Sequence, residues 1–301
     1  MDTAQLLSKL HTGDARAIAR AISLVEDQEA ASTEIMGGLD RNRLAETLVV
    51  GITGPPGAGK STLTASLVKS LRSRNIRVGI IAIDPSSPLT GGALLGDRIR
   101  MMEHTLDPDV VVRSMATRGR LGGLCASAGA AVRILAASGC RVILIETVGI
   151  GQSEMDIVSL ADITMMVLAP GFGDDIQAMK AGILEVVDLL VINKADQPGA
   201  QKLLLDLGKE TANSDRVLQT IASEHQGVDE LLARVFALEE VLREQGELMK
   251  RRERSHRHET LDWTVELLKP HLQQLIQKQQ QTDQDPGKTA QEVVCRLLAT
   301  M

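Results

Sequence analysis

The sequence predicts an α/β fold in which a mainly parallel β-sheet lies between layers of helices. Between residues 47 and 222, short apolar runs rich in β-branched residues alternate with helical stretches. Each run is continuously apolar, which is typical of strands buried on both faces. Roughly 15 to 30 residues separate one run from the next, enough for a helical crossover between parallel strands. The runs lie at 48–52, 78–83, 110–112, 142–145, 163–168, 189–192 and 217–221.

Helical segments flank this region on both sides. In residues 1–45, apolar residues recur at helical spacing, and Asp14 stands where the N-cap of a second helix is expected. After residue 227 no strand-like run occurs, and a Gln-rich stretch ending in Asp-Pro-Gly is expected to break the helix before a final short one. We therefore expect a helical extension at 1–45, an α/β domain at 46–226 and a helical region at 227–301.

The composition excludes several classes of function. The chain has 301 residues, 44% of them hydrophobic and 24% charged, with a formal net charge of -6. Its aromatic residues are Phe172, Phe236 and Trp263, and it has no Tyr. Proteins that bind single-stranded nucleic acid stack bases on aromatic rings, and duplex binders need a basic surface. We therefore expect no nucleic-acid partner and an aliphatic core.

The cysteines and the apolar segments bear on location. Cys125, Cys140 and Cys295 are isolated and form no CxxC pattern, which fits a reducing compartment better than a disulfide framework. The first residues have no basic and apolar signal-peptide pattern. No apolar run approaches the roughly 18 residues that a membrane-spanning helix needs. A cytoplasmic location without a membrane partner is expected.

The strongest motif directly follows the first predicted strand. The segment GPPGAGKS at 54–61 matches GxxxxGK[ST] and precedes a predicted helix. In such a P-loop, backbone N–H groups surround phosphate oxygens, the lysine contacts the β- and γ-phosphates, and the hydroxyl ligates Mg²⁺. The sequence thus predicts a P-loop NTPase three-layer sandwich. The nucleotide-binding residues are Gly54, Pro55, Pro56, Gly57, Ala58, Gly59, Lys60, Ser61 and the next helical residue, Thr62.

A second motif indicates which base is bound. Asn193, Lys194 and Asp196 form NKxD at the end of the sixth run. A carboxylate such as Asp196 accepts two hydrogen bonds from the ring N–H and the exocyclic amine of guanine, and adenine offers no matching pair of donors. Asn193 would support the loop, and the stem of Lys194 would cover the ring. GTP is therefore favoured over ATP as the bound nucleotide, with GDP as the product.

Acidic and amide side chains follow other strands. Common GTPases have Asp-x-x-Gly after the strand that here leads into Glu146 and Gly149. Glu146 is one methylene longer and would reach a Mg²⁺-bound water or orient the attacking water, a role for which Gln152 is a rival. Asp84 ends the second run, at the edge where α/β proteins bind ligands. Asp97 ends a Gly-rich loop that would approach the metal, although an ordinary solvated loop is the alternative.

These residues together resemble the metalloenzyme-serving branch of the SIMIBI-class P-loop GTPases. Within it they resemble the MeaB/ArgK-like group, the GTPases associated with methylmalonyl-CoA mutase. The resemblance covers roughly residues 10 to 240. It rests on GDARAIARAISLVED at 13–27, GPPGAGKST at 54–62, IDPSS at 83–87, TGGALLGDRIRM at 90–101, TRGRLGGL at 117–124, ETVGIGQSE at 146–154 and PGFGDDIQAMKAGILEVVDLLVINKADQPGA at 170–200.

The resemblance implies a GTP-hydrolysing chaperone that binds an adenosylcobalamin-dependent acyl-CoA mutase of the methylmalonyl-CoA mutase type, gates its cofactor loading and protects it. It also implies a homodimer formed by the C-terminal helices, and it places Asp84, Asp97 and Glu146 around Mg²⁺ and the γ-phosphate. Switch I would lie at 97–124 and switch II at 149–156. Switch III would lie at 171–180 and include Gly171, Phe172, Asp174, Asp175 and Lys180.

One departure and three alternatives accompany this resemblance. The Ser-Ala loop that usually faces the guanine carbonyl reads Ile-Ala here, so the amide of Ala222 would take that role. A kinase linked to transport of lysine, arginine or ornithine is one alternative. A nickel or cobalt metallochaperone-type GTPase is another, although His-rich and CxCC segments are missing. A scaffold that only binds nucleotide is the third. The basic segment 250–258 is expected to be a solvated helical face.

Overall fold

The computed structural model describes residues 2–27, 30–84, 107–116, 123–147, 153–171, 183–210, 214–278 and 285–300. These residues form a seven-stranded sheet with the order β3-β2-β4-β1-β5-β6-β7. All neighbouring strands are parallel, so the predicted α/β sheet is confirmed. The strands are β1 (Leu48–Thr53), β2 (Val78–Asp84), β3 (Val110–Ala116), β4 (Val142–Thr147), β5 (Ile163–Leu168), β6 (Leu189–Asn193) and β7 (Val217–Thr220).

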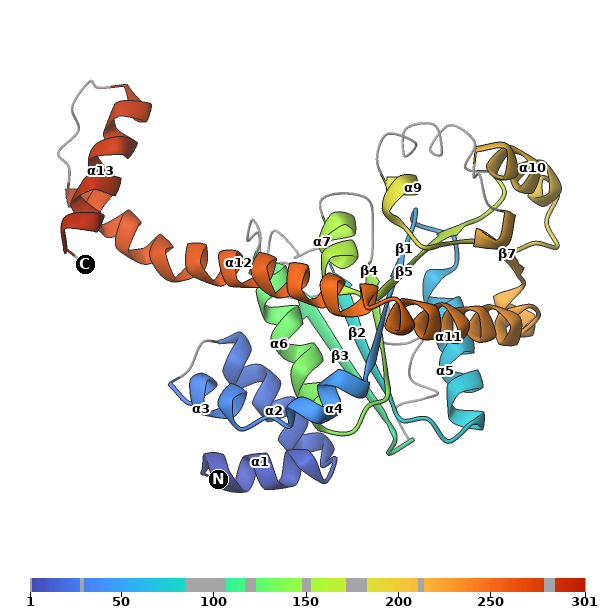
Figure 1. The fold of residues 1–301 in the computed structure, drawn as a ribbon, viewed down its shortest axis with the longest axis horizontal. Coiled ribbons are helices and arrows are strands. Elements are labelled where there is room, and N and C mark those ends of the chain that lie inside the picture. The colour runs from blue at the N-terminus through green and yellow to red at the C-terminus, as the bar shows by residue number, and fades with distance from the viewer. Residues whose placement is uncertain are drawn as a thin grey trace.

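Helices cover both faces of the sheet, which explains why the strands are continuously apolar (Figure 1). Side chains alternate between the faces: Val49 and Ile81 belong to one buried cluster, and Val50 and Ile80 belong to another. A third cluster lies beside β6. The covering helices are α6 (Gly123–Ala137) and α7 (Ser153–Leu160) on the first face, α5 (Lys60–Ser73) and α11 (Val228–Glu244) on the second, and α9 (Ile183–Val186) and α10 (Ala200–Glu210) beside β6.

The N-terminal helices form an outer layer against α6. Leu10, Ile18 and Ile22 are buried in the same cluster as the sheet residues of that face. Asp14 caps the second helix as predicted, because its side chain accepts a hydrogen bond of 2.7 Å from the N–H of Ala17. These helices are α1 (Thr3–His11), α2 (Ala15–Glu26), α3 (Ser32–Gly37) and α4 (Arg41–Glu46).

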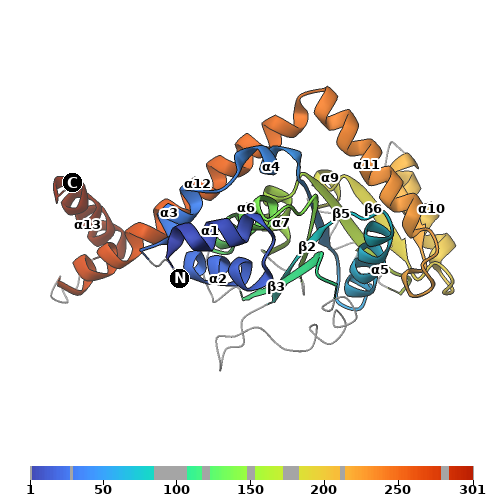
Figure 2. The same cartoon turned by 90° about the horizontal axis from the view of Figure 1, so that it is seen from below.

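The C-terminal helices begin on the body of the molecule and leave it. Helix α12 (Glu247–Lys278) packs on α6 and α7 and then projects outward, and α13 (Pro286–Thr300) packs against its far end (Figures 1 and 2). Two single-turn 3₁₀ helices, η2 (Ser214–Arg216) and η3 (Ala222–Glu224), flank β7. Among the described helices, none combines the length and apolarity required to cross a membrane. The division into three parts at residues 45 and 226 stays a prediction.

Two arginines hold α12 against the edge of the sheet where the parallel strands begin. The guanidinium of Arg252 makes two bonds to Asp162, with Nε–Oδ1 at 2.8 Å and Nη2–Oδ2 at 2.7 Å. Arg251 binds Asp188 in the same way, at 2.9 Å and 2.8 Å. Planar guanidinium groups suit such paired contacts with carboxylates. We call these four residues the arm clamp.

Both carboxylates of the arm clamp are also part of the sheet. Asp162 accepts a bond of 2.9 Å from the N–H of Val49 on β1, and Asp188 accepts one of 2.8 Å from the N–H of Thr164 on β5. Burial disfavours the charge of Arg252, but hydrogen bonding and attraction to Asp162 outweigh it and raise its pKa above the usual value. The guanidinium group of Arg252 therefore stays charged at any physiological pH.

This contact corrects the interpretation of the basic segment 250–258 as a solvated face. Lys250, Arg254 and Arg257 do lie in solvent with acidic neighbours on the same helix. Arg251 and Arg252 instead face the sheet and are mostly covered. Helical periodicity separates these two groups, but the sequence does not show which face of α12 meets another element.

Replacing Arg252 by alanine is expected to lower the free energy of unfolding by about 3 kcal/mol, because the buried carboxylate of Asp162 loses its charged partner. Urea unfolding followed by circular dichroism measures this change.

Arg257→Ala is the matched control, because Arg257 lies on the same helix but is 77% exposed and 3.7 Å from Glu253. Its effect should stay below about 0.5 kcal/mol. Equal effects of the two variants would show that the clamp does not stabilise the fold.

Candidate nucleotide-binding site

The P-loop follows the central strand of the sheet and lies at the carboxyl ends of the parallel strands. It connects β1 to α5, and β1 is the central strand. In the register with β4, Ile52 pairs with Glu146, so the chain enters the loop beside that carboxylate. The predicted loop and the predicted acidic position thus lie side by side, as expected for ligand sites at the carboxyl ends of parallel strands.

Two glycines of the loop are required by close contacts. A Cβ on Gly54 would lie 2.1 Å from the carbonyl oxygen of Val167, and one on Gly59 would lie 2.3 Å from Nδ2 of Asn193. Both residues have positive φ, 136° and 91°, where side chains are strained. Gly59 thereby lets the loop approach β6 directly.

The first turn of α5 forms an anion site. Gly59 is its N-cap and provides no side-chain capping bond, and the first N–H groups of a helix have no intrahelical partners. The side chain of Lys60 is folded over the loop, where Nζ donates to the carbonyl oxygens of Gly54 at 2.7 Å and Pro55 at 3.1 Å. Its ammonium group thus lies where a phosphate oxygen would compete for it.

Glu146 is buried and hydrogen-bonded to two hydroxyl groups of α5. Ser61 Oγ donates to Oε1 at 2.5 Å, and Thr64 Oγ1 donates to Oε2 at 2.9 Å. Only 1% of Glu146 is exposed. The hydroxyl bonds give both carboxylate oxygens a partner in this buried position and fix the orientation of the side chain toward the first turn of α5.

The donors present here fit the predicted Mg²⁺. Hydroxyl and carboxylate oxygens are the ligands that this ion prefers, and it commonly takes one or two protein groups together with phosphates and water. Ser61 and Glu146 supply such oxygens at one point. Nearby, the hydroxyls of Thr53 and Thr147 are buried without a hydrogen-bond partner within the described part of the chain. The site therefore contains two buried hydroxyl groups that no described residue hydrogen-bonds.

Asn193 connects the P-loop to the end of β7. Its Nδ2 donates to the carbonyl oxygen of Ala58 at 3.0 Å, and its Oδ1 accepts bonds from Thr220 Oγ1 at 3.2 Å and from the N–H of Ala222 at 3.1 Å. The side chain is almost fully buried. This arrangement matches the predicted supporting role of Asn193.

The other base-recognition residues lie around Asn193. Lys194 has a φ of 54°, and its Nζ donates to the carbonyl oxygen of Gly57 at 2.8 Å, so its stem passes over the loop. Asp196 is exposed and available to a ligand. The role expected for Ala222 stays a prediction, and its N–H donates to Asn193 Oδ1 in this structure. A guanine carbonyl would have to share or displace this bond.

Several predicted residues lie outside the described part of the chain. These are Asp97, Gly149 and Gln152, and, from the predicted switch III, Phe172, Asp174, Asp175 and Lys180. Asp84 is the last residue of β2, so its backbone lies at the same edge of the sheet as the P-loop. Gly171 is the last described residue after β5 and is exposed. Roles for these residues stay predictions.

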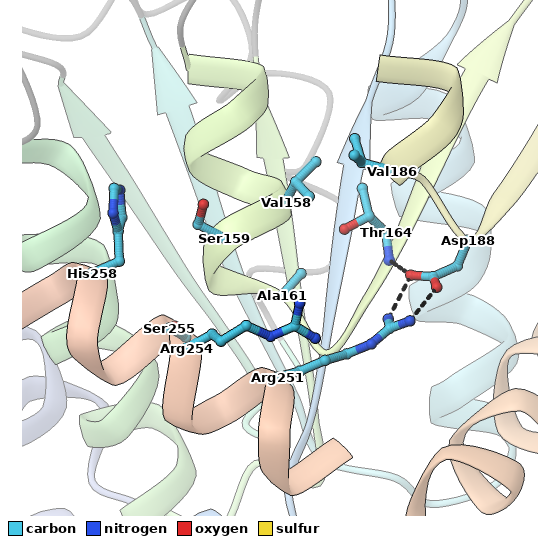
Figure 3. Close-up of a pocket in the computed structure, with 10 residues that line it drawn as sticks. All are labelled: Val158, Ser159, Ala161, Thr164, Val186, Asp188, Arg251, Arg254, Ser255 and His258. Carbon is cyan, nitrogen blue, oxygen red and sulfur yellow. Dashed lines mark hydrogen bonds and ion pairs between the residues drawn. The ribbon is translucent and has the colours of Figure 1, made fainter. Parts of the chain in front are cut away.

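A cavity of about 460 Å³ lies at the other edge of the sheet, between α12 and the ends of α7 and α9 (Figure 3). Arg251 points across it to Asp188, and Arg254 and His258 line it from the same helix. None of the predicted nucleotide-binding residues borders it. The cavity therefore belongs to the contact between α12 and the sheet.

The sequence interpretation missed Thr64 and Thr220. Thr64 lies three residues after Ser61, on the same side of α5, so the helical spacing carried the signal. Thr220 is the last residue of β7, beside Asn193 in the strand register. Only the pairing of β6 with β7 reveals that contact.

Gly59→Ala is expected to weaken GDP binding by at least about tenfold, because the methyl group would push Asn193 away from the loop. Titration with a fluorescent N-methylanthraniloyl GDP measures the affinity.

Gly208→Ala is its control. Gly208 is exposed in α10 and has no atom within 4 Å of an added Cβ. It should leave GDP affinity unchanged and stabilise the helix by about 0.5 to 1 kcal/mol. Wild-type affinity in Gly59→Ala would argue against the close contact.

Comparisons with known proteins agree with this geometry. A sequence model of the family described as "Methylmalonyl Co-A mutase-associated GTPase MeaB" matches residues 18–281. A putative GTPase of Pyrococcus abyssi is 42% identical over 98% of this chain and 96% of its own length. The GTPase ArgK of Escherichia coli is 32% identical over 86% of this chain and 82% of its own length.

One solved structure and one mammalian relative add to these comparisons. The crystal structure of a "LAO/AO transport system kinase" superposes with a TM-score of 0.72 over 98% of this chain and 97% of that chain, at 23% identity, which shows the shared fold. A mouse protein named "Methylmalonic aciduria type A homolog, mitochondrial" is 38% identical over 64% of this chain and 49% of its own length. The chain is a P-loop GTPase and belongs to the MeaB family of methylmalonyl-CoA mutase-associated GTPases.

Proposed function

We propose that this GTPase binds an adenosylcobalamin-dependent acyl-CoA mutase of the methylmalonyl-CoA mutase type, gates loading of its cofactor and protects it. The observation that carries the proposal is the family match over residues 18–281, which includes the nucleotide site and the whole of α12. The name of the mouse relative, with its reference to methylmalonic aciduria, supports the same class of partner.

The positions of α6, α7 and α12 support a switch rather than a simple nucleotide binder. Helix α6 begins at the end of the predicted switch I, and α7 begins within the predicted switch II. Helix α12 packs on both. Arg133 of α6 binds the buried carboxylate of Glu259 on α12, with Nη1–Oε2 at 2.6 Å. In this proposal, a conformational change of the switch segments at the γ-phosphate shifts α6 and α7, and these two helices contact α12.

In the proposed hydrolysis, water attacks the γ-phosphate, and the P-loop and Lys60 neutralise charge on the phosphates. When bound, Mg²⁺ supplies further neutralisation and is held by Ser61, with Glu146, Asp84 and Asp97 as the proposed acidic groups. Glu146 is oriented by the hydroxyls of Ser61 and Thr64. Gln152 remains the rival for positioning the water.

The C-terminal helices support the proposed homodimer. Beyond the body, α12 exposes apolar side chains, among them Leu261, Val265 and Leu267, each at least half exposed. Such a surface is typical of a protein interface. A cytoplasmic location is also proposed, since Cys140 and Cys295 are free thiols, as is usual in a reducing compartment.

Asp196→Asn is expected to lower the preference for GTP over ATP by on the order of 100-fold, because an amide cannot accept both guanine N–H bonds. Its N–H₂ group can instead donate to the C2 carbonyl of xanthine, so XTP should gain affinity. Competition of each nucleotide against labelled GDP measures the ratios.

The control variant is Glu240→Gln, which removes an exposed carboxylate on α11 and should leave the ratios unchanged. An unaltered GTP/ATP ratio in Asp196→Asn would refute the assignment of base recognition to this residue.

Addition of a methylmalonyl-CoA mutase is expected to accelerate single-turnover GTP hydrolysis by on the order of tenfold, since the partner is proposed to bind the transition state for hydrolysis more tightly than the GTP-bound state. The rate is followed with GTP labelled at the γ-phosphate. The mutase should also co-elute with the protein bound to a non-hydrolysable GTP analogue, and light scattering should give the free protein twice the chain mass.

Lys60→Ala is the negative control, because it removes the ammonium group at the phosphate site. Equal rates with and without the mutase, together with no co-elution, would contradict the chaperone proposal. Label found on a protein substrate instead of in free phosphate would favour the kinase alternative.

A further inference from the structure

Helix α5 contacts Glu146 with one side. With its opposite side it contacts the segment that follows β7. Ser66 Oγ lies 2.6 Å from Nδ1 of His225. One turn further along, the hydroxyl of Ser70 donates to the carboxylate of Asp229. Nε2 of His225 lies 3.8 Å from Asp229 Oδ2. Two serines with helical spacing thus contact two residues that also lie four apart.

His225 belongs to the loop that contains Ala222. We define residues 221–226 as the base loop. Backbone bonds between Ile221 and Gln226, at 3.0 Å and 3.2 Å, close this loop on itself. The N–H of His225 donates to the carbonyl oxygen of Ala222 at 3.3 Å, and its φ is 60°. A shift of His225 would therefore move Ala222 with it.

The base loop is joined to the phosphate site by two routes. The first is Asn193, which contacts both Ala58 and Ala222. The second is the Ser66–His225 contact, since Ser66 is six residues after Lys60 on the same helix. An α-helix is stiff and rises about 1.5 Å per residue, so this second route spans roughly 9 Å without a flexible element.

The burial of Ser66 makes its hydrogen bond with His225 important for the position of the base loop. Ser66 is 7% exposed, so its hydroxyl depends on a protein partner, and it hydrogen-bonds to His225. A buried hydroxyl that loses its partner is unfavourable, which gives the contact a preferred geometry. The backbone after His225 is also restricted, because a Cβ at Gly227 would lie 2.2 Å from the carbonyl oxygen of Gln219.

We propose that His225 is a positioning residue for the nucleotide: its hydrogen bond with Ser66 holds the base loop at a set distance from the P-loop. Base and phosphates belong to one covalently linked ligand and must fit both loops at once, so this distance influences how long the nucleotide stays bound. The proposal rests on the assignment of Ala222 to the 6-carbonyl of guanine. It assigns His225 no part in the hydrolysis step.

The test compares His225→Gly, Ser66→Ala and the double variant. Glycine adopts positive φ without strain and has no side chain to make the contact, and Ser66→Ala removes the same contact without changing the backbone of the base loop. Each single variant should release labelled GDP about fivefold faster in stopped-flow measurements, while single-turnover hydrolysis of bound GTP changes less than about twofold. Because both remove the same contact, the double variant should be no faster than either single variant.

Ser70→Ala is the matched control on the same face of α5. Ser70 contacts Asp229 on α11 and not the base loop. It should lower thermal stability without changing GDP release. Additive effects in the double variant, unchanged release in His225→Gly, or equal release in Ser70→Ala and Ser66→Ala would each overturn the proposal.

Competition with ITP and ATP separates this proposal from the site assignment on which it rests. GTP and ITP share the 6-carbonyl, whereas only GTP has the 2-amino group. His225→Gly should therefore weaken GTP and ITP by the same factor, about fivefold, and weaken ATP less. Asp196→Asn should change the ratio of GTP to ITP. If only Asp196→Asn has its expected effect, the His225 proposal fails; if only His225→Gly does, the assignment of Asp196 fails.

Discussion

The buried side-chain amide of Asn193 joins the segments on which nucleotide binding depends. It donates to the P-loop carbonyl of Ala58 and accepts from Thr220 and from the N–H of Ala222. A primary amide provides both donors and an acceptor, so one side chain can connect a loop before one helix with a loop after a distant strand. Because it is buried, each of these bonds is costly to lose, and the three segments keep one arrangement.

The rest of the site is arranged around this connection. Gly59 has no side chain, so Asn193 can approach the loop. The loop in turn places Lys60 and Ser61 at the start of α5, and the parallel pairing of β1 with β4 brings Glu146 to the same point. Thr64, one turn into the helix, completes the hydrogen bonding of that carboxylate. The phosphate end and the base end are thus parts of one hydrogen-bonded unit.

At the opposite edge of the sheet, where the parallel strands begin, the C-terminal helices are attached. There the charged pairs of the arm clamp attach α12 to the starts of β5 and β6, while α6 and α7 provide the packing surface. Asp162 and Asp188 each accept hydrogen bonds from a backbone N–H of the sheet and from an arginine of α12, so the sheet and α12 share the same two carboxylates. The sheet therefore lies between the nucleotide site and the C-terminal helices, and the helices that run along it connect its two edges.

The sequence by itself determined the order of strands and helices, the P-loop, the NKxD motif and the acidic position of Glu146. These signals are local, because a buried parallel strand is continuously apolar and a phosphate loop needs its glycines at set spacing. Only the tertiary structure decided which distant residues meet. Thr64 and Glu146, Asn193 and Ala222, and Arg252 and Asp162 are each brought together by strand order or helix packing, which no local pattern encodes. The basic segment shows this most clearly, since its charges predicted solvent exposure and two of its arginines instead bind the sheet.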